Sequence, residues 1–126
     1  MPEELSRETL EALLEALPTD LNFVDETDTI RYRRARRVFR SKPEVIGQKV
    51  QDCHSAASVP MVNWIISDFK SGREKEFEFW KDRKGRKIYI RYFPVKDKAG
   101  KYIGTLEVIE DITDIRKITG EKTELD

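Results

Sequence analysis

The sequence predicts an α+β domain: a five-stranded antiparallel sheet with helices on one face, and an amphipathic N-terminal helix. Three observations lead to this fold class. The 126 residues suffice for one hydrophobic core but not for two. Short runs of β-forming residues are separated by three turns of the same spacing. One long amphipathic stretch with helical periodicity lies between the second and third runs.

The composition indicates which partners and which cellular compartment to expect for the protein. The 24 basic residues balance the 24 acidic ones, so no net charge attracts nucleic acid or an anionic membrane. The single cysteine cannot form a disulfide framework, and no N-terminal apolar run resembles a signal peptide or a membrane span. We therefore expect a cytoplasmic protein without nucleic-acid or membrane partners.

Residues 1–18 are expected to form the N-terminal amphipathic helix. Ser6 is a suitable N-cap, and Pro18 ends the segment. The apolar positions have helical spacing and form one stripe: Leu10, Leu13, Leu14 and Leu17. A stripe of this kind needs another surface to cover it.

Strands are expected in five runs, namely "LNFVD", "TIRYRR", "REKEFEFWKD", "KIYIRYFPVKD" and "KYIGTLEVIEDIT". The turns between them, "DETD" (25–28), "DRKG" (82–85) and "DKAG" (97–100), each place Gly or Asp three residues after an Asp. An Asp side chain can accept a hydrogen bond from the backbone two residues on, and Gly readily adopts positive φ. All three are therefore predicted to be hairpin turns.

Between the second and third strands the pattern becomes helical. The segment 35–47 is predicted to form short helical turns broken by Pro43 and ended by Gly47. The segment 58–72 is predicted to be a helix with Ser58 as N-cap, Pro60 in its first turn and Gly72 at its end. Its apolar stripe consists of Val62, Ile65, Ile66 and Phe69.

The fourth predicted strand has apolar residues on both faces. Ile88, Ile90 and Tyr92 share one face, and Tyr89, Phe93 and Val95 share the other, around Arg91. A half-solvated antiparallel strand is normally polar on one side. Both faces are therefore expected to be covered, one by the middle helices and the other by the N-terminal helix and a second copy. This predicts a homodimer.

The order of these elements, with "VIGQKV" ahead of the long helix and "GTLEVIEDIT" at the end, resembles a PAS domain. The resemblance extends from about residue 14 to about residue 120. It is closest to the PAS module at the C-terminus of uncharacterised proteins with a hemerythrin-like metal-binding region. That subtype usually continues Cys-His with two prolines and a lysine, whereas this chain has "CHSAAS".

The resemblance implies a sensory module rather than an enzyme. It implies a PAS core over residues 19–113, with a small-molecule cavity between the sheet and the long helix, and a signalling helix or linker over 114–126. Asp111 and Thr113, in the terminal Asp-Ile-Thr, can cap the following helix and so relay the signal.

Cys53 and His54 are the only residues of their types, and they are adjacent. A covalent haem site needs a cysteine where Val50 stands, a structural zinc site needs four ligands, and the cysteine of flavin-binding PAS relatives would also align with Val50. Two interpretations remain. Either His54, or less readily Cys53, is the axial ligand of non-covalent haem, or the pair is a bend that begins the long helix, with Cys53 packed as a small apolar residue.

Six further residues are candidates for the cavity wall: Met61, Trp64, Ile65, Trp80, Arg91 and Tyr92. The alternative is that they are ordinary core or dimer surface. For Arg91 the alternative is a cross-strand ion pair with Glu78 or Glu107.

The arginine-rich run 31–42 has two interpretations. It could bind nucleic acid, a small anion or an acidic partner, because arginines neutralise phosphates. Alternatively its charges meet the acidic N-terminal helix. Balanced net charge favours the second.

No arrangement of residues indicates catalysis, because neighbours on a bend seldom form a nucleophile and base pair. The leading hypothesis is a ligand-gated sensor. Two alternatives are a ligand-free PAS module for dimerisation or interaction, and a haem sensor that uses His54.

Overall fold

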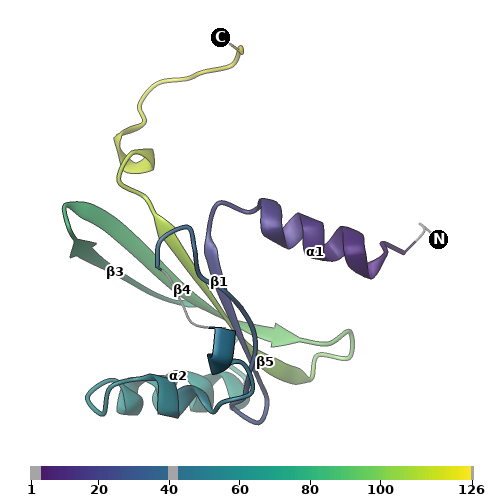
Figure 1. The fold of residues 1–126 in the computed structure, drawn as a ribbon. Helices are drawn as coiled ribbons and strands as arrows, with labels where there is room; N and C mark the ends of the chain where they lie inside the picture. Colours follow the sequence, from purple (N-terminus) through teal and green to yellow (C-terminus); the bar gives the residue numbers. More distant parts are fainter. Residues whose placement is uncertain (1–3, 40–42, 126) are drawn as a thin grey trace.

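The computed structural model describes residues 4–39 and 43–125. A five-stranded antiparallel sheet has the strand order β2-β1-β5-β4-β3, and two α-helices and three short 3-10 helices accompany it (Figure 1). The strands are β1 (Asp20–Asp25), β2 (Ile30–Arg34), β3 (Phe77–Arg83), β4 (Arg86–Lys96) and β5 (Tyr102–Asp111). The helices are α1 (Arg7–Ala16), η1 (Pro43–Val45), η2 (Val50–Cys53), α2 (Val59–Lys70) and η3 (Ile115–Lys117). The expected fold class is confirmed.

The three hairpin turns form where expected, but by two mechanisms. Asp25 and Asp97 each accept hydrogen bonds from the backbone amides two and four residues on. The β3–β4 turn instead has Lys84 at φ 52° and Gly85 at φ 77°, which suits a tight two-residue hairpin. Its Asp82 pairs with Lys87 on the neighbouring strand. The shared spacing in the sequence therefore has a different cause in this third turn.

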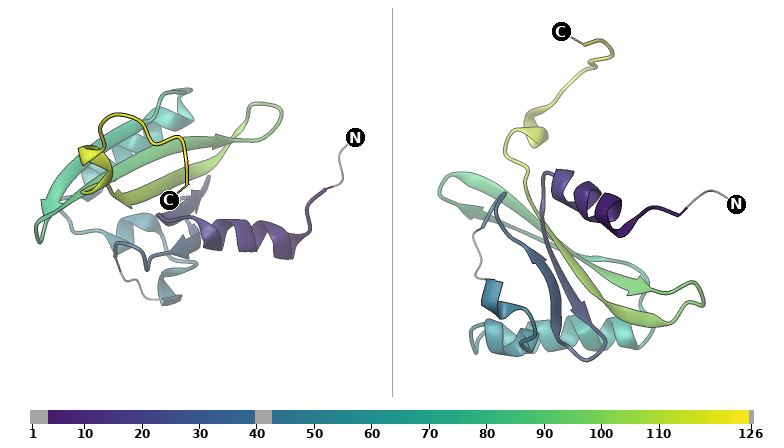
Figure 2. Two further views of the ribbon diagram at one scale, coloured as in Figure 1. Left: turned by 90° about the horizontal axis from the view of Figure 1, so that it is seen from above. Right: turned by 45° about the vertical axis from the view of Figure 1, so that its right-hand side comes forward.

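Helix α2 covers one face of the sheet, which we call the inner face, and Figure 2 shows this arrangement from two further directions. The predicted apolar stripe of the helix, Val62, Ile65, Ile66 and Phe69, is buried. Ser58 precedes the helix as expected, but its hydroxyl is close to that of Ser55 rather than to a helix amide. Pro60 lies in the first turn, where a missing amide costs little.

Helix α1 begins at its predicted cap, Ser6, which accepts a hydrogen bond from the Thr9 amide. None of its residues is buried, and the helix extends away from the sheet toward the N-terminus (Figures 1 and 2). It therefore covers little of the opposite face, which we call the outer face.

Two arginines hold the end of α1 against the chain after β2. Arg36 forms an ion pair with Glu15. Arg37 donates to the carbonyls of Leu17 and Glu15 at 3.2 and 3.0 Å. The second interpretation of the arginine run, contact with the acidic helix, holds for these two residues. The run's residues 40–42 lie outside the described part of the chain.

A fully buried carboxylate organises the segment that follows β2. Asp20 accepts hydrogen bonds from four successive backbone amides, those of residues 36–39, at 2.6 to 3.0 Å. Hydrogen bonds to a charged acceptor are stronger than neutral ones, and here they offset the cost of burying the charge. No local pattern in the sequence indicates this role of Asp20.

For the segment after β5, a signalling helix or a linker is expected. It forms the single turn η3 and then extends without regular structure to residue 125 (Figure 1). Within residues 4–39 and 43–125, no helix has both the length and the apolar character needed to cross a bilayer.

A candidate ligand cavity between the sheet and α2

A cavity of about 40 Å³ lies between the inner face and α2. Its walls come from three parts of the fold, the sheet, η2 with the bend after it, and α2. They consist of Asn22, Val24, Ile30, Arg33, Val50, His54, Val62, Ile65, Ile66, Tyr92, Thr105 and Glu107.

Four polar residues form one row across the sheet wall of this cavity. Asn22 on β1 is in register with Arg33 on β2 and with Glu107 on β5, and Glu107 is in register with Tyr92 on β4. The Asn22 Nδ2 group donates to Glu107 Oε1 at 2.5 Å, and the Tyr92 hydroxyl donates to Glu107 Oε2 at 2.6 Å. We call Arg33, Asn22, Glu107 and Tyr92 the polar row.

The polar row has unsatisfied hydrogen-bonding capacity. Asn22 Oδ1 and Arg33 Nε are buried, and neither has a hydrogen-bond partner within the described residues. Burial, followed by the carboxylate of Glu107, raises the pKa of Tyr92 well above its usual value, so its hydroxyl stays protonated and donates. A buried polar atom without a partner costs about 1–3 kcal/mol, so such atoms are rare away from binding sites.

Apart from His54 and Thr105, the rest of the cavity wall is apolar. Val24, Ile30, Val50, Val62 and Ile66 form one buried cluster. Apolar walls with a few convergent polar groups are typical of small-molecule sites. Of the six further residues predicted for the wall, Ile65 and Tyr92 line the cavity.

His54 lies at the mouth of the cavity, because it lines the cavity and is also exposed. Its Nδ1 is 2.9 Å from the carbonyl oxygen of Val50, which can only accept, so Nδ1 carries the hydrogen. In the neutral ring Nε2 is then an acceptor. Cys53 does not line the cavity. It packs beside the apolar cluster, and its sulfur is 3.5 Å from Gln48 Oε1.

A haem does not fit the residues at this site. A porphyrin is much larger than a cavity of about 40 Å³. His54 lies at the mouth of this small cavity, directly after η2, so the space on its inner side is too small for a porphyrin. The bend interpretation of the Cys53–His54 pair agrees with this geometry.

Met61, Trp64 and Trp80 do not line the cavity. Trp64 and Trp80 are 59% and 62% exposed, and Met61 is exposed as well. On α2 the stripe containing Val62 and Ile65 faces the sheet, so positions 61 and 64 turn aside, and Trp64 rests against Phe77. Trp80 is in register with Tyr89, on the outer face.

Arg91 also lies on the outer face, because Tyr92 next to it points inward and successive strand residues alternate. It lies near the rings of Tyr89 and Phe93, and its Nη2 is 3.9 Å from Glu110. The expected cross-strand ion pair of Arg91 therefore forms, but with Glu110 on β5 rather than with Glu78 or Glu107, although Glu78 is in register with Arg91. Glu78 instead accepts from the Tyr89 hydroxyl.

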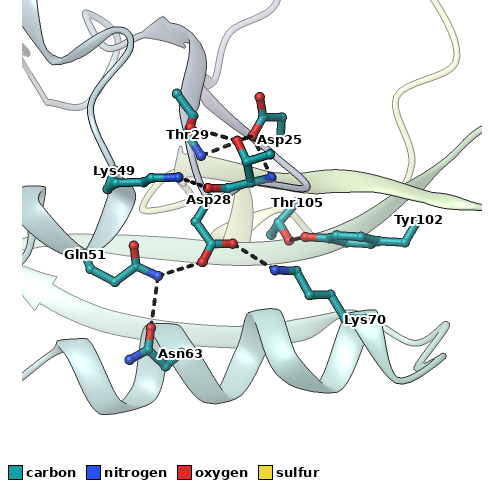
Figure 3. Close-up of polar contacts among 10 residues, drawn as sticks. Asp25, Asp28, Thr29, Lys49, Gln51, Asn63, Lys70, Tyr102 and Thr105 are labelled. Atoms are coloured by element: carbon teal, nitrogen blue, oxygen red, sulfur yellow. Dashed lines mark hydrogen bonds and ion pairs between the residues drawn. The ribbon is translucent and has the colours of Figure 1, made fainter.

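A polar cluster holds α2 against the β1–β2 turn at one end of the cavity (Figure 3). Asp28 accepts from Lys70 Nζ at 3.1 Å and from Gln51 Nε2 at 3.0 Å, and the same Gln51 group donates to Asn63. Asp28 sits in the turn, Gln51 in η2, and the other two in α2. These contacts join α2 to the β1–β2 turn and to η2.

Comparison with known proteins places the chain in a family. The family model described as "PAS domain" matches residues 10–113. The chain belongs to the PAS domain family. No curated protein sequence matches it.

Solved structures share this PAS fold. The C-terminal domain of a Streptococcus mutans protein is 25% identical, with a TM-score of 0.83 over 94% of this chain and 96% of that one. The PAS domain of Bordetella pertussis BvgS is 16% identical, with a TM-score of 0.63 over 87% and 88% of the two chains. A Vibrio cholerae sensory box sensor histidine kinase is 15% identical, with a TM-score of 0.59 over 85% and 91%.

At the end of the PAS core, Asp111 and Thr113 tie the exit of the chain to β4. Asp111 Oδ1 accepts from the amide and hydroxyl of Thr113, and its Oδ2 accepts from Arg86 Nε at 2.8 Å. The Thr113 hydroxyl accepts from the Lys87 amide at 2.8 Å. The two residues therefore fasten the exit to the sheet, and no side-chain cap was found at η3.

Three members of the polar row were not predicted from the sequence to line the cavity: Asn22, Arg33 and Glu107. Asn22 stands between Leu21 and Phe23, so alternation alone would place the two apolar residues inward. The available signal was the pairing of strands, since a polar residue at the matching position of adjacent strands indicates a shared row.

Proposed function

We propose that this PAS domain is a sensory module that binds a small molecule between the sheet and α2. The single observation that carries the proposal is the polar row with two buried, unpartnered atoms on the wall of a cavity. A filled, purely structural core would replace Asn22 and Arg33 by apolar residues at lower cost. A bound molecule would supply the missing hydrogen-bond partners.

The proposed signal leaves through the segment after Thr113. Glu107 and Tyr92 lie on β5 and β4, and the ends of these same two strands are joined through Asp111, Arg86 and the amide of Lys87. A shift of the two strands on binding would therefore move η3. In this proposal Asp111 and Thr113 relay the change, and the domain has no catalytic step of its own.

The test is a screen of small molecules by two-dimensional amide NMR, with two matched variants of α2. Val62→Ile adds one methylene inside the cavity. Val59→Ile makes the same change at a half-buried position of the same helix that does not line the cavity. We expect at least one compound to shift the amides of Val24 and Thr105, with binding weakened by Val62→Ile and unchanged by Val59→Ile.

Binding should also shift the amides of η3, and Thr113→Val should remove that distant shift while leaving the shifts at the cavity. If no compound perturbs the cavity, or the two valine variants behave alike, the sensor proposal fails. The remaining function is then a ligand-free module for dimerisation or interaction.

We also propose a homodimer through the outer face, since PAS domains commonly dimerise. A groove of about 590 Å³ lies between the end of α1 and the sheet. We call it the outer groove, and its walls consist of Leu14, Leu17, Thr19, Leu21, Phe23, Tyr32, Arg91, Val95, Leu106 and Val108. A second copy would bring its own α1 and outer groove, so the exposed leucines of both helices and both grooves could be covered together.

The resemblance to the hemerythrin-associated subtype supports a further proposal about the larger protein. In it, the domain operates in the cytoplasm beside a hemerythrin-like metal-binding region of the same polypeptide. The support is the motif match alone, and the test is iron content and localisation of the full-length gene product.

A further inference from the structure

We propose that the cavity selects an uncharged amide or lactam with a small apolar body. The geometry offers one acceptor and one donor on adjacent strands, which match an N–H group next to a carbonyl. This inference rests on the proposed function, because it names the chemical class of the ligand for the same cavity.

Asn22 supplies the acceptor. Its Nδ2 group donates to the Glu107 carboxylate at 2.5 Å, which fixes the orientation of the side-chain amide, because the reverse orientation would set two oxygens against each other. Oδ1 is therefore the atom that remains buried without a partner. Only a group with a hydrogen to donate can satisfy it.

Arg33 supplies the donor. It is in register with Asn22 on the neighbouring strand, lines the same cavity, and has a buried Nε without a partner. Directly opposed residues on one face of an antiparallel pair have Cβ atoms about 4.5–5.5 Å apart. One small group can therefore reach both side chains.

Charge on the same wall favours a neutral ligand. Glu107 lies next to Asn22 in the polar row, and its two oxygens already accept hydrogen bonds from Asn22 and Tyr92. An anionic ligand would be attracted by Arg33 but repelled by Glu107. A cationic ligand would be attracted by Glu107 but repelled by Arg33. A neutral amide satisfies the unpartnered atoms without adding charge to a buried site.

The remaining walls limit the size and polarity of the ligand. Val24, Ile30, Val62 and Ile66 present only carbon to a space of about 40 Å³. The body of the ligand must then be apolar and no larger than a small ring. Thr105 and His54 lie on the cavity wall and could contact polar atoms at its edge.

The experiment compares γ-butyrolactam with two analogues that lack its N–H group: cyclopentanone, which has nearly the same shape, and the N-methyl derivative, which is larger by one methyl group. The lactam has donor and acceptor, and the other two have only the acceptor. Titrations of the wild-type domain are followed through the amides of Val24, Val62 and Thr105. We expect the lactam to bind at least about tenfold more tightly than either analogue, because the analogues leave Asn22 Oδ1 without a partner.

Variants at Arg33 test the donor. Arg33→Lys keeps the positive charge but has no Nε, so it should lose most of the affinity for the lactam. Arg31→Lys on the same strand is the control, because Arg31 is exposed and binds Asp25 away from the cavity. Thermal unfolding followed by circular dichroism checks that each variant is folded before titration.

Each outcome decides between the two proposals. Equal binding of all three probes at the cavity overturns the amide inference but supports the sensor. If the lactam does not bind but other compounds of the screen occupy the cavity, the amide inference is likewise overturned and the sensor is supported. If neither the probes nor the screen reaches the cavity, both proposals fail.

Discussion

Both faces of the sheet depart from the usual arrangement of polarity, the inner face because polar residues interrupt its apolar core, and the outer face because apolar residues line an open groove. The inner face, beneath α2, carries the polar row of Arg33, Asn22, Glu107 and Tyr92. The outer face carries apolar side chains such as Phe23, Leu106 and Val108 around an open groove. A half-solvated antiparallel sheet normally has its apolar side inward and its polar side outward.

This difference indicates two kinds of interaction. Polar groups under a helix lower stability unless they are satisfied, so their presence favours a site for a polar ligand. Apolar groups facing water do not require a partner, but a continuous apolar surface indicates an interface with another protein. In the proposals above, the inner face is therefore the site for a small molecule, and the outer face is the surface for association between copies.

The largest expected effect is on the inner face, at Asp20. Asp20→Ala removes the acceptor of four backbone amides in a fully buried position. We expect a loss of about 3–4 kcal/mol in the free energy of unfolding, measured by urea denaturation. The control is Asp97→Ala, which removes a carboxylate that also accepts backbone amides, but in an exposed turn. Equal losses in both variants would contradict the importance given to burial.

On the outer face, the next largest effect is on association. Leu106→Glu places a carboxylate in the outer groove, and we expect it to weaken the proposed dimer by at least about tenfold, since charges are poorly tolerated at the centre of an interface. Analytical ultracentrifugation measures the dissociation constant. Glu110→Gln, beside Arg91 on the same face, is the comparison variant, and we expect it to change the dissociation constant less. A wild-type protein that stays monomeric at high concentration would exclude this use of the outer face.

Two tyrosines of β4 compare the faces directly. Tyr92 points inward and donates to Glu107 at 2.6 Å, and Tyr89 points outward and donates to Glu78. Tyr92→Phe leaves a buried carboxylate oxygen without its donor, and we expect a loss of about 1–2 kcal/mol in the free energy of unfolding. Tyr89→Phe, on an exposed pair, should change it very little. A larger loss for Tyr89→Phe would reverse the assignment of the two faces.

The sequence predicts most of the fold because local signals specify it. The Asp-based turns at 25–28 and 97–100, the Ser6 cap and the stripe of Val62, Ile65, Ile66 and Phe69 each act over a few residues. The turn at 82–85 forms as well, although Lys84 and Gly85 rather than Asp82 shape it.

The candidate site is less predictable because it depends on the pairing of distant strands. The bond between Asn22 and Glu107 joins residues 85 positions apart, and no local pattern contains it. Arg91 and Trp80 were assigned to the cavity by residue type, whereas strand alternation places both outside. Aromatic and charged residues were the conspicuous candidates, but the cavity wall consists mainly of aliphatic residues and the polar row.

The smallest expected effect is on the pH dependence of stability, at Asp111, where the chain leaves the sheet. Hydrogen bonds from Arg86 and then Thr113 lower the pKa of Asp111 from 3.8 to about 2. A carboxyl group whose pKa is lowered by folding stabilises the folded state at any pH above its pKa in the unfolded chain. This contribution is lost as the pH falls toward its pKa in the folded protein.

Wild type should therefore lose stability between pH 3.8 and about pH 2 more steeply than Asp111→Asn, which cannot titrate there. Urea denaturation at a series of pH values gives both curves, and their difference removes the contribution of other carboxylates. Asp114→Asn is the matched control, because its carboxylate is also near Arg86, at 3.5 Å, but is largely exposed. Parallel curves for wild type and Asp111→Asn would show that Asp111 does not hold the exit segment against β4, and the relay proposed for Asp111 and Thr113 would lose its structural basis.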